Sequence, residues 1–399
     1  MIVPGSFSIA RLPRIVFGAG SIGEVSGLAS GFGQRALLVC GARSLRAATH
    51  WRTLEAAFRA AGMSVELVAV GGEPSPQLID DSVRTFRDRR VDVVVGIGGG
   101  SVLDAAKAIA GLLPHGNSVM DHLEGVGRNV PYRGPATPWI AVPTTAGTGS
   151  EATKNAVLSV QGAQGFKKSF RHDALVAQVA VVDPELLATC PPELISANGM
   201  DAFTQLLESY VSLRANPFTD ALALSGIEAV RDGFFAAWRG GTDAQGRAGR
   251  ARMAYASLLS GITLAQAGLG SVHGLASPLG AYFPVPHGVV CGTLVATATE
   301  MNLRALRARA PAHEALGKYA RIGTLLAETP PRTAQEACDG LVATLYEWTA
   351  RLKLPLLGSY GVSTYDIERI VAGARGSSMQ TNPVVLTDPE IGEIVRQRL

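Results

Sequence analysis

The chain has 399 residues, more than one ordinary hydrophobic core accommodates, so we expect two packed domains. Hydrophobic residues make up 47% of it and charged residues 17%, a composition that excludes a disordered chain. The formal charge of +3, from 36 basic and 33 acidic residues, excludes a nucleic-acid groove and a basic membrane patch. Part of the large apolar surface is expected to be covered in a homodimer or higher homo-oligomer.

The spacing of the cysteines and the N-terminal sequence indicate the cellular compartment. Cys40, Cys190, Cys291 and Cys338 are far apart without a CxxC pair, which predicts neither a disulfide framework nor a thiolate zinc site. The N-terminus lacks the basic start and apolar core of a signal peptide. The uncharged stretch 253–299 is interrupted by Gly, Pro, Ser, Thr and His, so it predicts buried helices and loops rather than a membrane span. We expect a cytoplasmic protein.

The first half alternates apolar strands with amphipathic helices. Strands are predicted at 35–41, in "SVELVAVGG", "VDVVVGIGGG" and "TPWIAVP", and at 177–187. Helices are predicted at 50–62, in "LIDDSVRTFRDRR" and in "SVLDAAKAIAGLL". Strands and helices in alternation are typical of a doubly wound, parallel, Rossmann-like sheet, and we therefore predict an α/β domain.

The pattern changes after about Pro191. From there to the C-terminus the segments are long, rich in Ala and Leu, and helical in period, with breaks at "ANPF", "GGTDAQG" and "PPRT". We predict an all-α second domain over 191–399, joined to the α/β domain over 1–190 by a hinge between packed domains.

A glycine loop follows the predicted strand "VDVVVGIG". Gly98, Gly99 and Gly100 stand at the strand end, Ser101 is expected to open a helix, and Asp104 fits a capping box with it. Bare glycines and the free N–H groups of a helix start allow a phosphate to approach, which suggests a pyrophosphate site. The loop is not the GxGxxG fingerprint, so a tight strand-to-helix turn is the alternative.

A second polar loop, "PTTAGTGSEAT", follows the next predicted strand. Thr144, Thr145, Thr148 and Ser150 supply hydroxyls between glycines. Ligands of parallel sheets bind at the carboxyl ends of strands, and two such loops suit an elongated phosphate ligand. A Ser/Thr-rich connection without a ligand is the alternative.

Two histidines, His273 and His287, lie within the uncharged stretch. An imidazole is costly to bury unless both ring nitrogens find partners. In "GMDAFTQLLESYVS", Asp201 and Gln205 are four residues apart and share one helical face. One carboxylate and two imidazoles suffice to hold a catalytic divalent cation. Hydrogen-bonded core histidines are the alternative reading.

Taken together, these motifs resemble the iron-containing (group III) alcohol dehydrogenases, a family that includes glycerol dehydrogenases and maleylacetate reductases. The resemblance runs from "PRIVFGAGSI" through "GGGSVLDAAKAIA", "PTTAGTGSEAT" and "GMDAFTQLLESYVS" to "HGLASPLGAYFPVPHG". It implies a dehydroquinate synthase-like architecture, with an NAD(P)-binding α/β domain, a helical domain, and Fe²⁺ or Zn²⁺ in the cleft between them.

Carried over by motif, the resemblance assigns metal ligands, a catalytic pair and cofactor contacts. The metal would be held by Asp201, Gln205, His273 and His287. The catalytic residues would be His273 and Ser277. The cofactor would contact Gly98, Gly99, Gly100, Ser101, Thr144, Thr145, Thr148, Lys167 and Leu186. Gly41 is added to these contacts from its place at the end of the first predicted strand.

Two positions depart from the family pattern. Gln205 stands where the family usually has a fourth ligand, His, and an amide oxygen donates more weakly than imidazole to zinc or ferrous iron. Ser277 replaces a second His near the substrate; a hydroxyl could relay a proton through water but cannot hold the charge.

The resemblance predicts reversible, metal-assisted hydride transfer between NAD(P)H and an aldehyde or ketone, with a small-molecule alcohol as the other substrate. Gln205 favours an alternative, a metal-independent enzyme of the maleylacetate reductase kind acting on an anionic keto acid. Two further alternatives are a lyase of the dehydroquinate synthase type and a non-catalytic nucleotide-binding protein.

The end of the first predicted strand bears on the choice of nicotinamide. Gly41 is followed by Ala42, Arg43 and Ser44, where NAD-preferring enzymes often have an acidic residue that repels the NADP phosphate. Arg43 could pair with that phosphate and Ser44 could donate to it. We therefore expect NADPH to be accepted at least as well as NADH.

Overall fold

The N-terminal half is built on a six-stranded parallel sheet. The structure, a computed structural model, describes residues 6–42, 49–162 and 164–399. Within these residues the strand order is β1-β8-β5-β4-β2-β3, and every neighbouring pair is parallel. The strands are β1 (Arg14–Phe17), β2 (Arg35–Gly41), β3 (Ser64–Val70), β4 (Val93–Gly98), β5 (Trp139–Pro143) and β8 (Val179–Val182).

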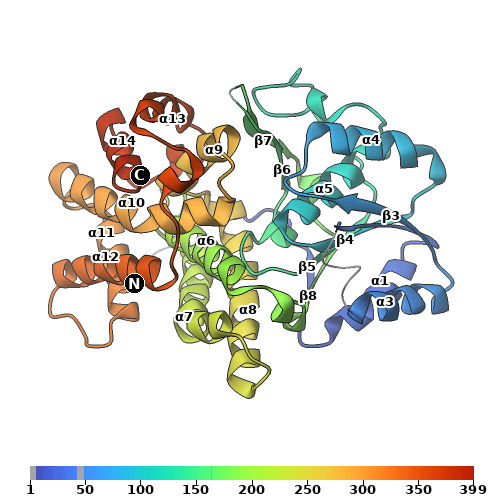
Figure 1. The fold of residues 1–399 in the computed structure, drawn as a ribbon, viewed down its shortest axis with the longest axis horizontal. Helices are drawn as coiled ribbons and strands as arrows, with labels where there is room; N and C mark the ends of the chain where they lie inside the picture. The colour runs from blue at the N-terminus through green and yellow to red at the C-terminus, as the bar shows by residue number, and fades with distance from the viewer. Residues whose placement is uncertain (1–5, 43–48, 163) are drawn as a thin grey trace.

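Helices cover both faces of this sheet (Figure 1). One face carries α1 (Val25–Ser30) and α3 (Thr49–Ala60), and the other carries α4 (Pro76–Phe86) and α5 (Gly100–Leu112). Successive side chains of β4 alternate between the two cores, since Val94 packs on the α5 side while its neighbours pack on the α3 side. Both cores are sealed from water, which explains the continuous apolar run of this strand.

Most of the predicted α/β elements are confirmed, and two strand features were missed. The alternation did not predict β1, nor the antiparallel hairpin of β6 (Asn155–Val160) and β7 (Phe166–Arg171). The predicted capping box was wrong. Helix α5 starts at Gly100 with Gly99 as an N-cap that has no side-chain hydrogen bond, and Asp104 instead accepts hydrogen bonds from the Ser150 hydroxyl and Val157 N–H.

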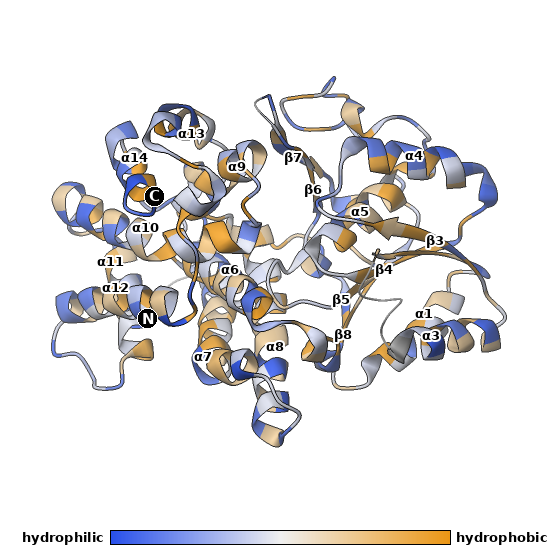
Figure 2. Cartoon of the chain, in the orientation of Figure 1, coloured by the Kyte–Doolittle hydropathy of each residue, from blue (hydrophilic) through white to orange (hydrophobic). Residues whose placement is uncertain are grey.

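The second half is helical, as predicted. Among regular elements after residue 191 the structure has only α- and 3₁₀-helices. In Figure 2 the apolar colouring gathers where these helices pack together and the hydrophilic colouring lies on their outer sides. The α-helices are α6 (Pro192–Val211), α7 (Pro217–Arg239), α8 (Ala244–Ala267), α9 (Ser271–Tyr282), α10 (His287–Arg309), α11 (Glu314–Leu326), α12 (Ala334–Arg351), α13 (Ile367–Gly373) and α14 (Asp388–Arg396).

The uncharged stretch forms the end of α8, all of α9 and the start of α10, and most of its side chains are buried. Within the described ranges, no helix is long and apolar enough to cross a membrane.

The two halves meet closely where Gly149, after β5, faces Gly261 on α8. A Cβ built on Gly149 would lie 2.4 Å from Gly261 Cα, so this contact requires glycine.

Candidate active site between the two halves

A cavity of about 840 Å³ lies where the α/β half meets the helical half. The glycine loop and the threonine loop line it from one side, and α6, α9 and the start of α10 line it from the other. A volume of this size is typical of small-molecule and cofactor sites, which often lie between domains.

The two loops at the strand ends lie against each other. A Cβ built on Gly99 would meet the Thr145 side chain at 3.2 Å, and one built on Gly100 would meet Thr148 at 2.7 Å. The glycines therefore leave room for the threonine hydroxyls beside the first N–H groups of α5. Those N–H groups and the positive end of the helix dipole attract an anionic phosphate.

Buried polar contacts of Lys107 join these loops. Its ammonium, fully buried on α5, donates to Ser150 Oγ at 3.0 Å, Thr153 Oγ1 at 2.8 Å and the Asn155 carbonyl at 2.8 Å. Asp104 lies 3.6 Å from the same nitrogen. Burial lowers the pKa of Lys107 and raises that of Asp104, while their mutual attraction opposes both shifts. The helix start and the threonine loop are thus held as one unit.

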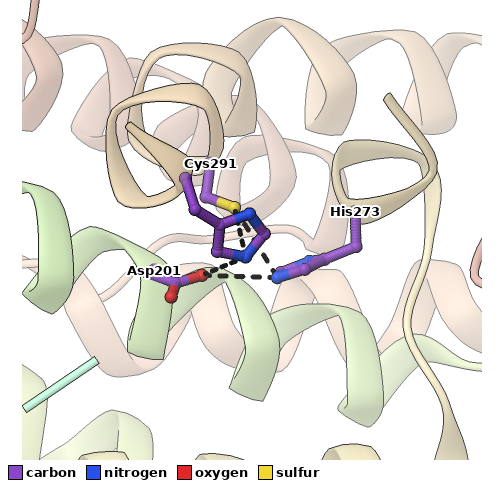
Figure 3. A group of neighbouring side chains, drawn as sticks. Asp201, His273 and Cys291 are labelled. Carbon is purple, nitrogen blue, oxygen red and sulfur yellow. Dashed lines mark hydrogen bonds and ion pairs between the residues drawn. The ribbon is translucent and has the colours of Figure 1, made fainter. Parts of the chain in front are cut away.

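Four side chains that can bind a metal converge at the opposite side of the cavity; three of them, Asp201, His273 and His287, line its wall, and the fourth, Cys291, is fully buried beside them. Asp201 from α6, His273 from α9, and His287 and Cys291 from α10 place one donor atom each within 4.8 Å of all the others. Asp201 Oδ1 lies 3.3 Å from His273 Nε2 and 3.7 Å from His287 Nε2. In Figure 3 the labelled Asp201, His273 and Cys291 point toward one another from three directions.

Asp201 is the clearest sign that this cluster suits a cation. Its side chain is 1% exposed, and neither carboxylate oxygen has a hydrogen-bond partner among the described residues. A buried carboxylate without hydrogen bonds is unfavourable unless a positive charge lies beside it. The donor set of one carboxylate and two imidazoles therefore fits a divalent metal ion.

Glu208 orients one of the two imidazoles. Its Oε2 is 2.7 Å from His273 Nδ1, and its Oε1 accepts the Val272 N–H at 2.7 Å. This leaves His273 Nε2 directed at the cluster, an arrangement common behind metal-binding histidines. His287 Nδ1 has no hydrogen-bond partner in the described part of the chain.

The two imidazoles differ in charge preference. Burial lowers the pKa of His287 to about 4, so its ring is neutral near pH 7 and offers a lone pair. Burial also lowers the pKa of His273, but the interactions of this ring with Cys291, Asp201 and Glu208 raise it by more. The pKa of His273 is therefore well above its usual value. The site thus favours a positive charge between Asp201 and Glu208.

The structure brings most of the predicted residues to the cavity. The cavity wall includes Gly99, Gly100, Ser101, Thr145, Thr148, Lys167, Asp201, Gln205, His273, Ser277 and His287. Gly98 and Thr144 do not line the cavity, but each directly precedes a residue that does, Gly99 and Thr145. The Thr144 N–H donates to the Gly98 carbonyl at 3.0 Å. Leu186 packs in the hydrophobic core on the side of the sheet that α1 and α3 cover, and Gly41 ends β2; neither lines the cavity. Arg43 and Ser44 lie outside the described residues.

Sequence reasoning missed Cys291, which belongs to the cluster, and Glu208, which holds His273 from outside it. Cys291 follows His287 by four residues on α10, and Glu208 follows Asp201 by seven on α6. Both spacings return to the same helical face, so this periodicity could have identified them. The expectation that the cysteines form no thiolate zinc site rested on the missing CxxC pair, a spacing that ligands from different helices do not need.

Comparison with known proteins agrees with this geometry. The sequence model described as "Iron-containing alcohol dehydrogenase" matches residues 13–184, and the model of the C-terminal part of the same family matches residues 195–399. The chain belongs to the iron-containing alcohol dehydrogenase family.

Individual relatives cover most of the chain. Alcohol dehydrogenase 4 of Saccharomyces cerevisiae is 33% identical over 329 residues, which is 82% of this chain and 81% of that protein. The NADPH-dependent butanol dehydrogenase of Clostridium saccharobutylicum is 30% identical over 363 residues, or 90% and 88% of the two chains. The crystal structure of a 1,3-propanediol oxidoreductase has a TM-score of 0.89 at 29% identity, covering 99% and 100%. The family member described here is an NAD(P)-dependent alcohol dehydrogenase.

Proposed function

We propose that this enzyme interconverts a small alcohol and its aldehyde or ketone at the Asp201 cluster, with a divalent metal ion held there. The observation that carries the proposal is the carboxylate of Asp201, buried without a hydrogen-bond partner and facing the Nε2 atoms of His273 and His287. When bound, the metal polarises the carbonyl oxygen and stabilises the alkoxide.

The dinucleotide is assigned to the two loops. Gly99, Gly100 and Ser101 offer backbone N–H groups at the start of α5, and Thr145 and Thr148 border them. Lys167 lines the same cavity, 3.2 Å from Glu73 Oε2. These residues would hold the pyrophosphate at the glycine loop, and the bound dinucleotide would supply or accept the hydride within the cavity that Asp201 also lines.

Ser277 is assigned to proton transfer. Its hydroxyl lines the cavity and donates to the Lys167 carbonyl at 3.2 Å, which leaves its lone pairs free to accept from water. The proton of the alcohol would then pass to solvent through water held at this hydroxyl, and Ser277 itself would not store charge.

Three finer assignments complete the proposal. Gln205 would be a weak contact to the metal, since its Oε1 already accepts the Ser260 hydroxyl at 2.7 Å. NADPH would serve at least as well as NADH, which the NADPH-dependent butanol dehydrogenase among the relatives supports. The active molecule would be a homodimer or a larger homo-oligomer.

His273→Ala tests the metal-dependent mechanism. We expect it to lose both bound metal, by elemental analysis, and turnover of aldehydes and ketones followed by NAD(P)H absorbance. His115→Ala, at an exposed position outside the cavity, is the control and should retain both. Full turnover of native enzyme after exhaustive chelation, with no metal found, would instead support the metal-independent reductase of keto acids that Gln205 favours.

A further inference from the structure

Cys291 occupies a position in the Asp201 cluster that no role above explains. The side chain is fully buried on α10, four residues after His287. Its Sγ lies 3.6 Å from His273 Nε2 and 3.8 Å from His287 Nε2, the two nitrogens that face Asp201. A thiol that only filled core volume would contact mainly carbon atoms, whereas this sulfur faces donor atoms.

Four of the six separations among the donor atoms come within about 0.2 Å of those around a single tetrahedral ion, and all six are within 4.8 Å. Oxygen, nitrogen and sulfur ligands about 2.0–2.3 Å from a zinc ion at tetrahedral angles lie about 3.3–3.6 Å from one another. The observed separations are 3.3 and 3.7 Å from Asp201 Oδ1 to the two imidazole nitrogens, and 3.6 and 3.8 Å from Cys291 Sγ to the same nitrogens.

Charge favours the same assignment. Asp201 and Cys291 are almost completely buried, and no Lys or Arg ion pair of the described chain involves Asp201. Asp201 and a Cys291 thiolate would balance the charge of a divalent cation within the ligand set itself, whereas Asp201 with the amide of Gln205 would supply one negative charge there and leave the second to Glu208 behind His273. Buried charges are tolerated when they are paired in this way.

We propose that the thiolate of Cys291, rather than the amide of Gln205, is the fourth metal ligand, and that it makes this centre select zinc over ferrous iron. The proposal rests on the metal site proposed above and adds the identity of one ligand and of the ion. Thiolate is a soft donor that favours zinc, and zinc also stands above iron in intrinsic affinity for such sites.

Cobalt substitution tests directly whether the Cys291 sulfur is bound to the metal. Metal-free enzyme is titrated with Co²⁺ alone, and the near-ultraviolet thiolate-to-cobalt charge-transfer absorption is recorded together with the cobalt bound per chain. We expect one cobalt ion per chain with this absorption in the native enzyme. Cys291→Ser should lose the absorption, and Cys338→Ser, at another buried free cysteine on α12, should retain it.

Competition between Zn²⁺ and Fe²⁺ under anaerobic conditions measures selectivity. A serine oxygen is a harder donor than the thiolate it replaces, so Cys291→Ser should lose more affinity for zinc than for iron, and we expect its zinc-to-iron preference to fall at least about tenfold. An unchanged preference would overturn the selectivity claim.

The native spectrum decides the ligand even if Cys291→Ser does not fold. Cobalt bound without the thiolate absorption would overturn the assignment of Cys291 while leaving the metal site intact. Failure of the native chain to bind cobalt or zinc would overturn this inference and the proposed metal-dependent function together.

Discussion

At the residue scale, Glu208 controls which nitrogen of His273 faces the cavity. Its two oxygens are both used, Oε1 by the Val272 N–H and Oε2 by His273 Nδ1. A carboxylate only accepts hydrogen bonds, so the ring must carry its proton on Nδ1 once Nε2 is occupied by a cation. The residue acts on the centre through His273 without being one of the ligands.

Glu208→Gln tests this control. The amide oxygen can still accept from Val272, but the amide nitrogen then faces His273 Nδ1 as a donor, which favours the tautomer with the proton on Nε2. That tautomer cannot bind a metal, so we expect affinity to fall about 10–100-fold. Metal retained after dialysis, measured by elemental analysis, checks this, with the exposed Glu193→Gln on the same helix as control. Native metal content in a folded Glu208→Gln enzyme would contradict it.

Residue type and family resemblance together predicted Asp201, His273 and His287 as a cluster. The two site residues that belong to no recognisable motif were harder to find. Cys291 and Glu208 are single residues of common type, and only the helical periodicity of α6 and α10 relates them to the predicted ligands. That Leu186 packs in the core on the α1 and α3 side of the sheet instead of lining the cavity depends on tertiary packing, which no local pattern encodes.

At the scale of elements, α5 connects the sheet to both loops. Its start is the glycine loop, and Lys107 in its second turn binds Ser150 and Thr153 of the threonine loop. The three N–H donors of Lys107 face four acceptors, two hydroxyls and the carbonyl oxygens of Ser150 and Asn155, so the buried ammonium is fully paired only while the threonine loop stays against the helix. The loops are therefore pre-organised, so little order has to be imposed when a phosphate binds.

Gly99→Val is predicted to weaken cofactor binding without unfolding the enzyme. The new Cβ would lie 3.2 Å from Thr145 Oγ1, a close contact that a small shift relieves, and the two methyl groups would fill the space beside the first N–H groups of α5. We expect the Kd for NAD(P)H to rise at least about tenfold, or ~1.4 kcal/mol. Fluorescence titration measures this, with circular dichroism for the fold. Gly340→Val, in open space on α12, is the control.

Periodicity predicted the central elements because burial shapes their sequences most strongly. β4 is apolar throughout, since both of its faces are covered. The hairpin of β6 and β7 has no such signal, because β7 reads "FKKSFR" and only one of its six residues is buried. β1 has four residues at an edge of the sheet and is largely exposed, so burial left no clear pattern in its sequence either.

At the scale of the molecule, the site depends on how the two halves meet. The threonine loop reaches α8 through Gly149, and the same short 3₁₀ turn, Ser150–Ala152, contains Glu151. The cavity has walls from both sides of this junction. Substrate and cofactor therefore meet only while the halves remain packed, which ties catalysis to the stability of the junction.

Glu151 should make that stability depend on pH. The side chain is 2% exposed, and burial raises its pKa to about 7 from 4.5 in the unfolded chain. Between these values the folded enzyme holds a proton that the unfolded chain has released, so stability falls as pH rises from 4.5 through 7. The full effect is on the order of 3 kcal/mol.

Glu151→Gln carries no charge at any pH and should remove this contribution. We expect the melting temperature of the native enzyme to fall more than that of Glu151→Gln when pH is raised from 5 to 8, with the variant more stable at pH 8. Differential scanning calorimetry at several pH values measures both curves. Lys107 lies near enough to attract the Glu151 carboxylate, so the native curve includes part of that attraction. Parallel curves for the two proteins would mean that Glu151 keeps an ordinary pKa in the fold, and that the junction tolerates its charge.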